Sequence, residues 1–68
     1  MSYYDYKVSK EIESAPFYAL IMAAMRRADS VNEAKLRGAW PEVWDELYER
    51  YHAPGGLTAH EREREARA

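Results

Sequence analysis

The residues best suited to bind a ligand lie at a predicted junction between two helices. Arg26 and Arg27 end one predicted helix, and the backbone amides near Asn32 begin the next. Amides at a helix N-terminus, beside the guanidinium forks of arginines, can bind a phosphate group. Lys35 adds positive charge, and the ring of Tyr51 can stack on a base. The pattern predicts a nucleotide-type ligand bound by Arg26, Arg27, Asn32, Lys35 and Tyr51.

The same positive charges also have a purely structural interpretation. Arginines in the last turn of a helix complement the negative end of its dipole. Asp29 follows Arg26 and Arg27 closely enough to pair with one of them. Both interpretations stay open at the level of the sequence.

A second candidate surface is acidic. Residues 41–51 contain four carboxylates against the single cation Arg50, and the carboxylates share one predicted helix face. They are Glu42, Asp45, Glu46 and Glu49. Such a face is usually just solvated, but it can also mimic nucleic acid or dock on a protein. The alternative function is therefore a protein–protein inhibitor or regulator.

Residue types argue against catalysis and against bound cofactors. The chain has no cysteine, which removes disulfides, thiolate metal sites and thiol nucleophiles together. The histidines, His52 and His60, are too few and too poorly spaced for a structural zinc site. No serine or threonine is placed with both a histidine and an acid. We expect no enzyme activity, no metal and no cofactor.

Charge and hydropathy exclude further classes. The 10 Lys and Arg residues against 12 Asp and Glu give a net charge of −2, whereas nucleic-acid binders usually have a basic excess. A helix-turn-helix with the helix after Pro41 as its recognition element would present acidic residues to DNA. The apolar run is too short to cross a bilayer, and the N-terminus lacks the features of a signal peptide. We expect a cytoplasmic protein that binds neither membrane nor nucleic acid.

The uncharged run at residues 16–25 predicts the central helix of the fold. Ser14 can cap this helix and Pro16 suits its first turn, so we expect it to continue to about Ala28. The run carries two apolar stripes, although a surface helix needs only one. The stripe expected to face the core is Phe17, Leu20, Ile21, Ala24 and Ala28. The other stripe is Tyr18, Met22 and Met25, and it forms either a homo-oligomer interface or a fuller core.

Two further main helices follow. The capping-box pair Ser30 and Glu33 predicts a short helix that ends near Gly38. The next helix begins at Pro41, and its apolar stripe has the spacing of the central helix, so the two should pack together. This stripe is Trp40, Val43, Trp44, Leu47 and Tyr51.

The two ends of the chain differ from this centre. A tyrosine-rich start with a stripe of Tyr4, Val8 and Ile12 predicts a short N-terminal helix that packs on the domain or on a neighbour. A turn centred on Pro54 and Gly55 ends the last main helix. Beyond it the chain is charged and has no apolar face. A second possible capping box, Thr58 with Glu61, stands at the start of this segment.

Together these patterns predict an all-α fold with three main helices and a short N-terminal helix. Residues 1–57 form the single domain, and residues 58–68 form a charged tail that is frayed or disordered unless a partner orders it. Because a chain of this length buries only about 60% of its unfolded surface, we expect a homo-oligomer.

The sequence also resembles short uncharacterised proteins of tailed phages. The likeness lies in the run from Phe17 to Asp29 (FYALIMAAMRRAD), in Pro41-Glu42, and in Arg50-Tyr51 followed by Ala53-Pro54-Gly55-Gly56. It implies an accessory protein that acts in the host cytoplasm against host defence, by sequestering a nucleotide signal or by binding a defence protein. A virion component is a third option. The resemblance transfers no binding residues.

Overall fold

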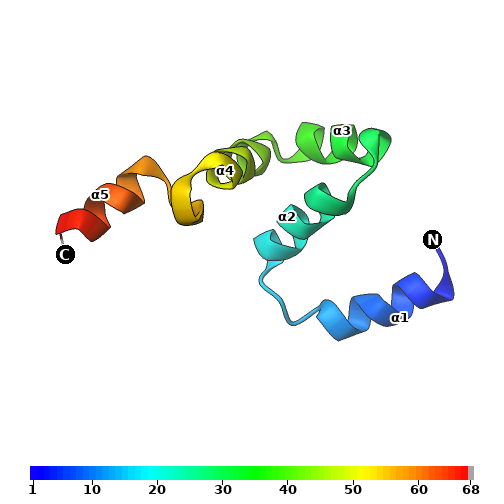
Figure 1. Ribbon diagram of the computed structural model, residues 1–68. Coiled ribbons are helices and arrows are strands. Elements are labelled where there is room, and N and C mark those ends of the chain that lie inside the picture. Colours follow the sequence, from blue (N-terminus) through cyan, green and yellow to red (C-terminus); the bar gives the residue numbers. More distant parts are fainter. Residues whose placement is uncertain (68) are drawn as a thin grey trace.

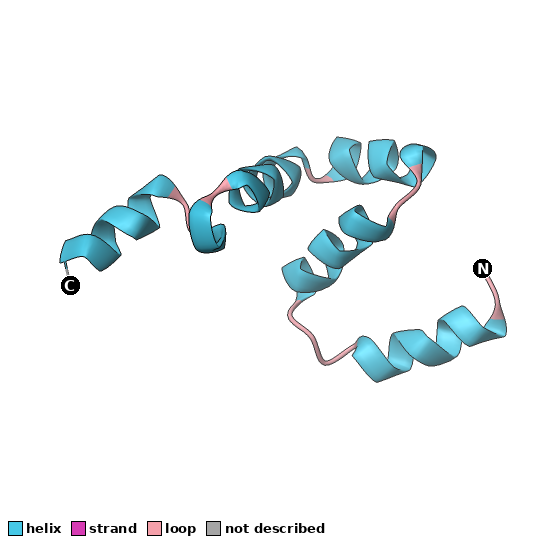
Figure 2. Cartoon of the chain, in the orientation of Figure 1, coloured by secondary structure: helices cyan, strands magenta, loops and turns pink. Residues whose placement is uncertain are grey.

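The computed structural model describes residues 1–67, and this range is helical with short connections. Figures 1 and 2 show the helices following one another as an open chain. The elements are α1 (Tyr3–Ile12), α2 (Phe17–Arg27), α3 (Ser30–Ala39), α4 (Pro41–His52), the 3₁₀-helix η1 (Pro54–Gly56) and α5 (Ala59–Arg67). The predicted all-α class is confirmed.

The helices form a small centre with two projecting ends. Helices α2, α3 and α4 pack on one another, whereas α1 packs on no other helix of the described chain (Figure 1). The radius of gyration is 14.9 Å, against about 11 Å for a compact domain of this length. The accessible surface is 5843 Å², against about 4,450 Å² for a folded monomer of this mass. Much apolar surface therefore stays exposed.

The core lies where α2 meets α4. Met25, Val43 and Leu47 are its buried side chains, with Met25 only 3% exposed. A ring of partly buried apolar side chains surrounds them: Ile21, Met22, Leu36, Trp40 and Trp44. The predicted packing of α2 on α4 is thus observed. Of the predicted α4 stripe, only Tyr51 is excluded from the core, since it is 74% exposed.

The face that α2 turns to the core matches the predicted stripe only in part, since Ile21 of that stripe packs there as expected. Phe17 and Ala24 were expected inside, but both are exposed. Met25, which was expected at an oligomer interface, is buried in the core of its own chain instead, and Met22 packs against that core while staying partly exposed. Long, flexible methionine side chains can reach across to α4 and fill its irregular surface, which short alanine side chains cannot. Met25 is consequently not available to a partner, while Tyr18 remains 55% exposed.

Helices α2 and α3 begin at residues other than the predicted caps. Helix α2 starts after Pro16, which has extended backbone angles and no capping side chain, so Ser14 lies outside the helix. Helix α3 is capped by Asp29, whose Oδ1 accepts from the Asn32 amide at 2.9 Å, rather than by Ser30. A carboxylate at the positive end of the dipole is more favourable there than a hydroxyl.

Helix α3 ends at Ala39, close to the predicted end near Gly38. The Trp40 amide still donates to the Leu36 carbonyl at 2.8 Å. Trp40 leaves the helical region because a residue before proline is disfavoured there. Pro41 then opens α4 at its first position, as predicted.

The turn after α4 follows the sequence prediction. The Gly56 amide donates to the Ala53 carbonyl at 3.1 Å, which places Pro54 and Gly55 at the centre of the turn. Gly55 has φ +64°, a left-handed conformation that glycine adopts without steric cost. The turn redirects the chain from α4 into α5.

Residues 59–67, which we expected in a frayed tail, form α5 in this structure. The predicted capping box is present: the Glu61 amide donates to Thr58 Oγ1, and the Thr58 amide donates to Glu61 Oε1. Residue 68, the end of the predicted tail, lies outside the described residues. Helix α5 can therefore form without an apolar face, because its N-terminus is capped and polar contacts attach it to the rest of the chain.

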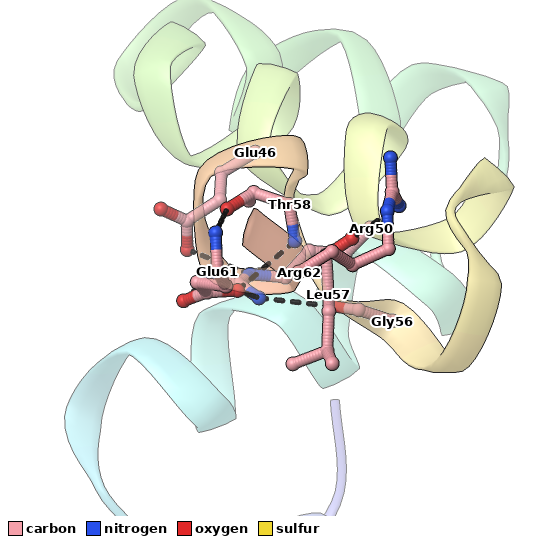
Figure 3. A network of polar contacts seen from close by, with 7 residues as sticks. All are labelled: Glu46, Arg50, Gly56, Leu57, Thr58, Glu61 and Arg62. Carbon is pink, nitrogen blue, oxygen red and sulfur yellow. Dashed lines mark hydrogen bonds and ion pairs between the residues drawn. The ribbon is translucent and has the colours of Figure 1, made fainter. Parts of the chain in front are cut away.

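Arg50 provides that attachment (Figure 3). Its guanidinium forms a bidentate pair with the Glu61 carboxylate, at 2.7 and 3.0 Å, and also donates to the Gly56 carbonyl at 2.9 Å. Glu46 lies 3.4 Å from Arg50 Nε, and Arg62 donates to the Leu57 carbonyl at 2.8 Å. This Arg50–Glu61 clamp joins α4, η1 and α5.

The clamp shifts the pKa values of both Arg50 and Glu61. The hydrogen bond from Arg50, helped by the Thr58 amide, lowers the pKa of Glu61 from 4.5 to about 2. The same hydrogen bond raises the pKa of Arg50 further above its ordinary value. Because the Arg50 and Glu61 side chains are still 30% and 37% exposed, solvent weakens their attraction.

We predict that Leu47→Ala severely destabilises the domain. Leu47 is buried where α2 meets α4, and such truncations cost about 2–5 kcal/mol of unfolding free energy. A domain of this length has only about 3–10 kcal/mol in total. Urea denaturation followed by circular dichroism measures the change. Val31→Ala, at a site 65% exposed on α3, is the matched control and should change stability by less than about 0.5 kcal/mol.

We predict that α5 detaches in acid. A carboxyl whose folded pKa is lowered stabilises the folded state above its unfolded pKa of 4.5, and this contribution is lost as the pH falls toward about 2. NMR signals of α5 should therefore shift to disordered values over that interval, while those of α2 persist. In Arg50→Gln the pKa of the Glu61 carboxyl should rise toward 4.5, with the Thr58 amide still lowering it in part; an unchanged titration would disprove the clamp.

Candidate functional site

An open hollow on the surface between α2 and α4 is the main candidate site. It has a volume of about 260 Å³. We call it the aromatic hollow, and its lining residues are Met25, Arg26, Trp44, Leu47, Tyr48, Tyr51 and His52. Met25 and Leu47 form a floor continuous with the core, and Arg26 contributes the cation from α2.

Helix α4 positions the aromatic side of this hollow. Trp44, Tyr48 and His52 are spaced four residues apart, so they lie on one face of the helix. The Tyr48 and His52 rings are 4.5 Å apart, and the Tyr51 and His52 rings meet edge to face at 5.3 Å. The hollow thus offers ring faces and edges on one side and a guanidinium on the other.

The structure brings together two of the five predicted ligand residues. Arg26 and Tyr51 line the aromatic hollow, although they belong to different helices. Asn32 and Lys35 are exposed on α3 and do not line it. The Asn32 amide already donates to Asp29, whose carboxylate would repel a phosphate. In this structure a carboxylate therefore occupies the amide at which the sequence predicted a phosphate.

Arg27 belongs to a second hollow, which has a volume of about 460 Å³. We call it the alanine groove, and its lining residues are Ala19, Met22, Ala23, Arg26, Arg27 and Leu47. Arg26 and Leu47 border both hollows. Because two of these residues are alanines, the side chains on this side of α2 are short, and another helix can approach its backbone closely.

Sequence reasoning missed two contributors to the aromatic hollow. Trp44 was assigned wholly to the core, and His52 was considered only as a metal ligand. The four-residue spacing of Trp44, Tyr48 and His52 was the available signal. That spacing shows a shared face, but not that Arg26 lies opposite it.

The acidic surface has the exposure that the sequence predicts. All four carboxylates of residues 41–51 are exposed on α4: Glu42, Asp45, Glu46 and Glu49. Glu46 is partly neutralised by Arg50 at 3.4 Å. The surface therefore remains a second candidate site.

The described residues contain no group of three or more histidine, cysteine or acidic side chains that could hold a metal ion. None of the helices in residues 1–67 has the length and apolar character needed to cross a membrane. Comparison with known proteins finds no matching family model, no matching curated protein and no matching solved structure.

Proposed function

We propose that this chain is a non-enzymatic binding protein whose aromatic hollow takes a planar, negatively charged ligand of the nucleotide type. The observation that carries the proposal is that Arg26 of α2 lines the same hollow as the rings of Tyr48, Tyr51 and His52 of α4. Aromatic faces stack on bases, and a guanidinium forms paired hydrogen bonds with phosphate.

The size and composition of the hollow limit the ligand. A volume of about 260 Å³ lies just below the range of about 300–1,000 Å³ typical of small-molecule pockets. It can receive one base while the sugar and phosphate stay near Arg26. A nucleotide signal with one exposed purine ring matches this arrangement better than an extended strand.

The biological setting of the proposal comes from the resemblance to short tailed-phage proteins. On that basis we place the protein in the cytoplasm of an infected host, where it would sequester a nucleotide signal used in defence. Sequestration needs binding without turnover, which agrees with a site that offers stacking and one cation.

We predict that calorimetry detects binding of a cyclic dinucleotide or an ADP-ribose derivative. Tyr51→Ala should weaken that binding by about tenfold or more, since stacking contributes about 1–3 kcal/mol per base. Arg26→Ala should weaken it comparably through loss of the phosphate contact. Arg27→Ala is the matched control, because it removes the same charge from the adjacent position outside the aromatic hollow.

Two results would contradict the ligand proposal. One is the absence of heat with every nucleotide tested. The other is binding that Arg27→Ala weakens as much as Arg26→Ala, because the attraction would then be general charge and not the hollow.

The exposed acidic surface of α4 supports a second candidate, a regulator that docks on a basic site of a host protein. We predict that replacing its carboxylates by amides abolishes retention of such a protein in a pull-down from host lysate. The variant carries Glu42→Gln, Asp45→Asn, Glu46→Gln and Glu49→Gln. A control with Glu63→Gln and Glu65→Gln on α5 should retain the partner; equal loss in both variants would exclude specific docking.

A further inference from the structure

We infer that α1 of one copy docks in the alanine groove of a second copy, and that the reciprocal contact forms a two-fold dimer. This inference does not depend on the ligand proposed above. It starts from α1, which packs on no other helix of the described chain.

Helix α1 carries an apolar stripe without a partner in its own chain. Tyr4, Val8 and Ile12 recur every four residues and share one face, and Tyr4 and Ile12 are 71% and 52% exposed. The opposite face is occupied internally, since Lys10 Nζ lies 5.2 Å from the centre of the Tyr6 ring. A helix of this length is marginal in isolation, so α1 needs a surface to pack on.

The alanine groove has the shape to receive such a helix. Ala19 and Ala23 keep the α2 backbone accessible, while Met22 and Leu47 provide apolar side chains beside them. An α-helix rises 1.5 Å per residue, so α1 is about 15 Å long, close to the length of α2. The stripe therefore matches the groove in both length and polarity.

Charges at the edges of the two surfaces are complementary. Asp5 and Glu11 flank the apolar stripe of α1, and Arg26 and Arg27 line the groove. Lys10 lies away from the stripe, over the Tyr6 ring. Docking would bring the acidic edges of α1 toward the arginines and would cover both apolar surfaces.

We assign a second copy of the chain to the groove because each chain exposes both the α1 stripe and the alanine groove. The chain exposes 5843 Å², about 1,400 Å² more than expected for a folded monomer of its mass. A standard interface buries about 800 Å² per partner, so one interface that comprises both reciprocal contacts fits within this excess. When the same two chains make both contacts, the interface is self-complementary and has two-fold symmetry.

The chain does not satisfy this contact by itself. A turn follows α1, closed by the hydrogen bond from the Ala15 amide to the Ile12 carbonyl at 3.1 Å. In Figure 1 the chain reverses direction at this turn, and α1 lies apart from the other helices. Both surfaces are thereby left available to another molecule.

Light scattering of the full chain at 100 micromolar tests the dimer, with the matched variants Tyr4→Glu and Tyr6→Glu. Wild type and Tyr6→Glu should have twice the monomer mass, and Tyr4→Glu should be monomeric. Because α1 packs on no other helix, neither substitution should unfold the rest. A monomeric wild type, or a Tyr4→Glu variant that still dimerises, would overturn the inference.

Disulfide trapping identifies the contacting surfaces, since the native chain has no cysteine. Mixing Val8→Cys with Ala23→Cys under mild oxidation should give a mixed disulfide, at least tenfold more than mixing Tyr6→Cys with Ala23→Cys. Equal yields would overturn the proposed groove. In the Val8→Cys, Ala23→Cys double variant at high dilution, a disulfide within one monomer would overturn docking between copies.

Discussion

The contact between α2 and α4 is the constraint on which the rest of this structure depends. It buries Met25 against Val43 and Leu47, and no other described side chain reaches the same burial. Apolar burial is the dominant favourable term in folding. A core of only three buried side chains therefore gives the fold a small free energy of unfolding. The short connections around α3 hold these two helices at the crossing that makes the contact.

A core of this size also explains where the candidate sites lie. Helices α2 and α4 are short and cross once, so each leaves part of the other's apolar surface uncovered. The two hollows lie beside this crossing. Arg26 and Leu47 border both hollows because they sit beside the crossing itself. The binding surfaces and the core are therefore parts of one contact, and a change in the rotation of α2 would alter them together.

Charge, more than apolar burial, organises the periphery. Helix α5 has no buried residue, yet Arg50 links it to α4 through a bidentate pair with Glu61 and a hydrogen bond to Gly56. At α3 a carboxylate replaces the expected hydroxyl cap and occupies the Asn32 amide that was predicted to bind a phosphate. At α5 the threonine cap is retained, and Glu61 completes it while also pairing with Arg50.

The sequence by itself determined helices α1 to α4, the prolines and glycines at the breaks between them and after α4, and the apolar stripe of α4, but not the order of α5. These are local properties, set by 3.6-residue periodicity and by the backbone limits of Pro41 and Gly55. It did not determine which face of α2 turns inward, because two stripes of similar hydrophobicity lie side by side on that helix. Only the tertiary structure decided this, through the reach of Met22 and Met25 across to α4. That choice placed Arg26 beside Tyr51 and left Asn32 and Lys35 outside.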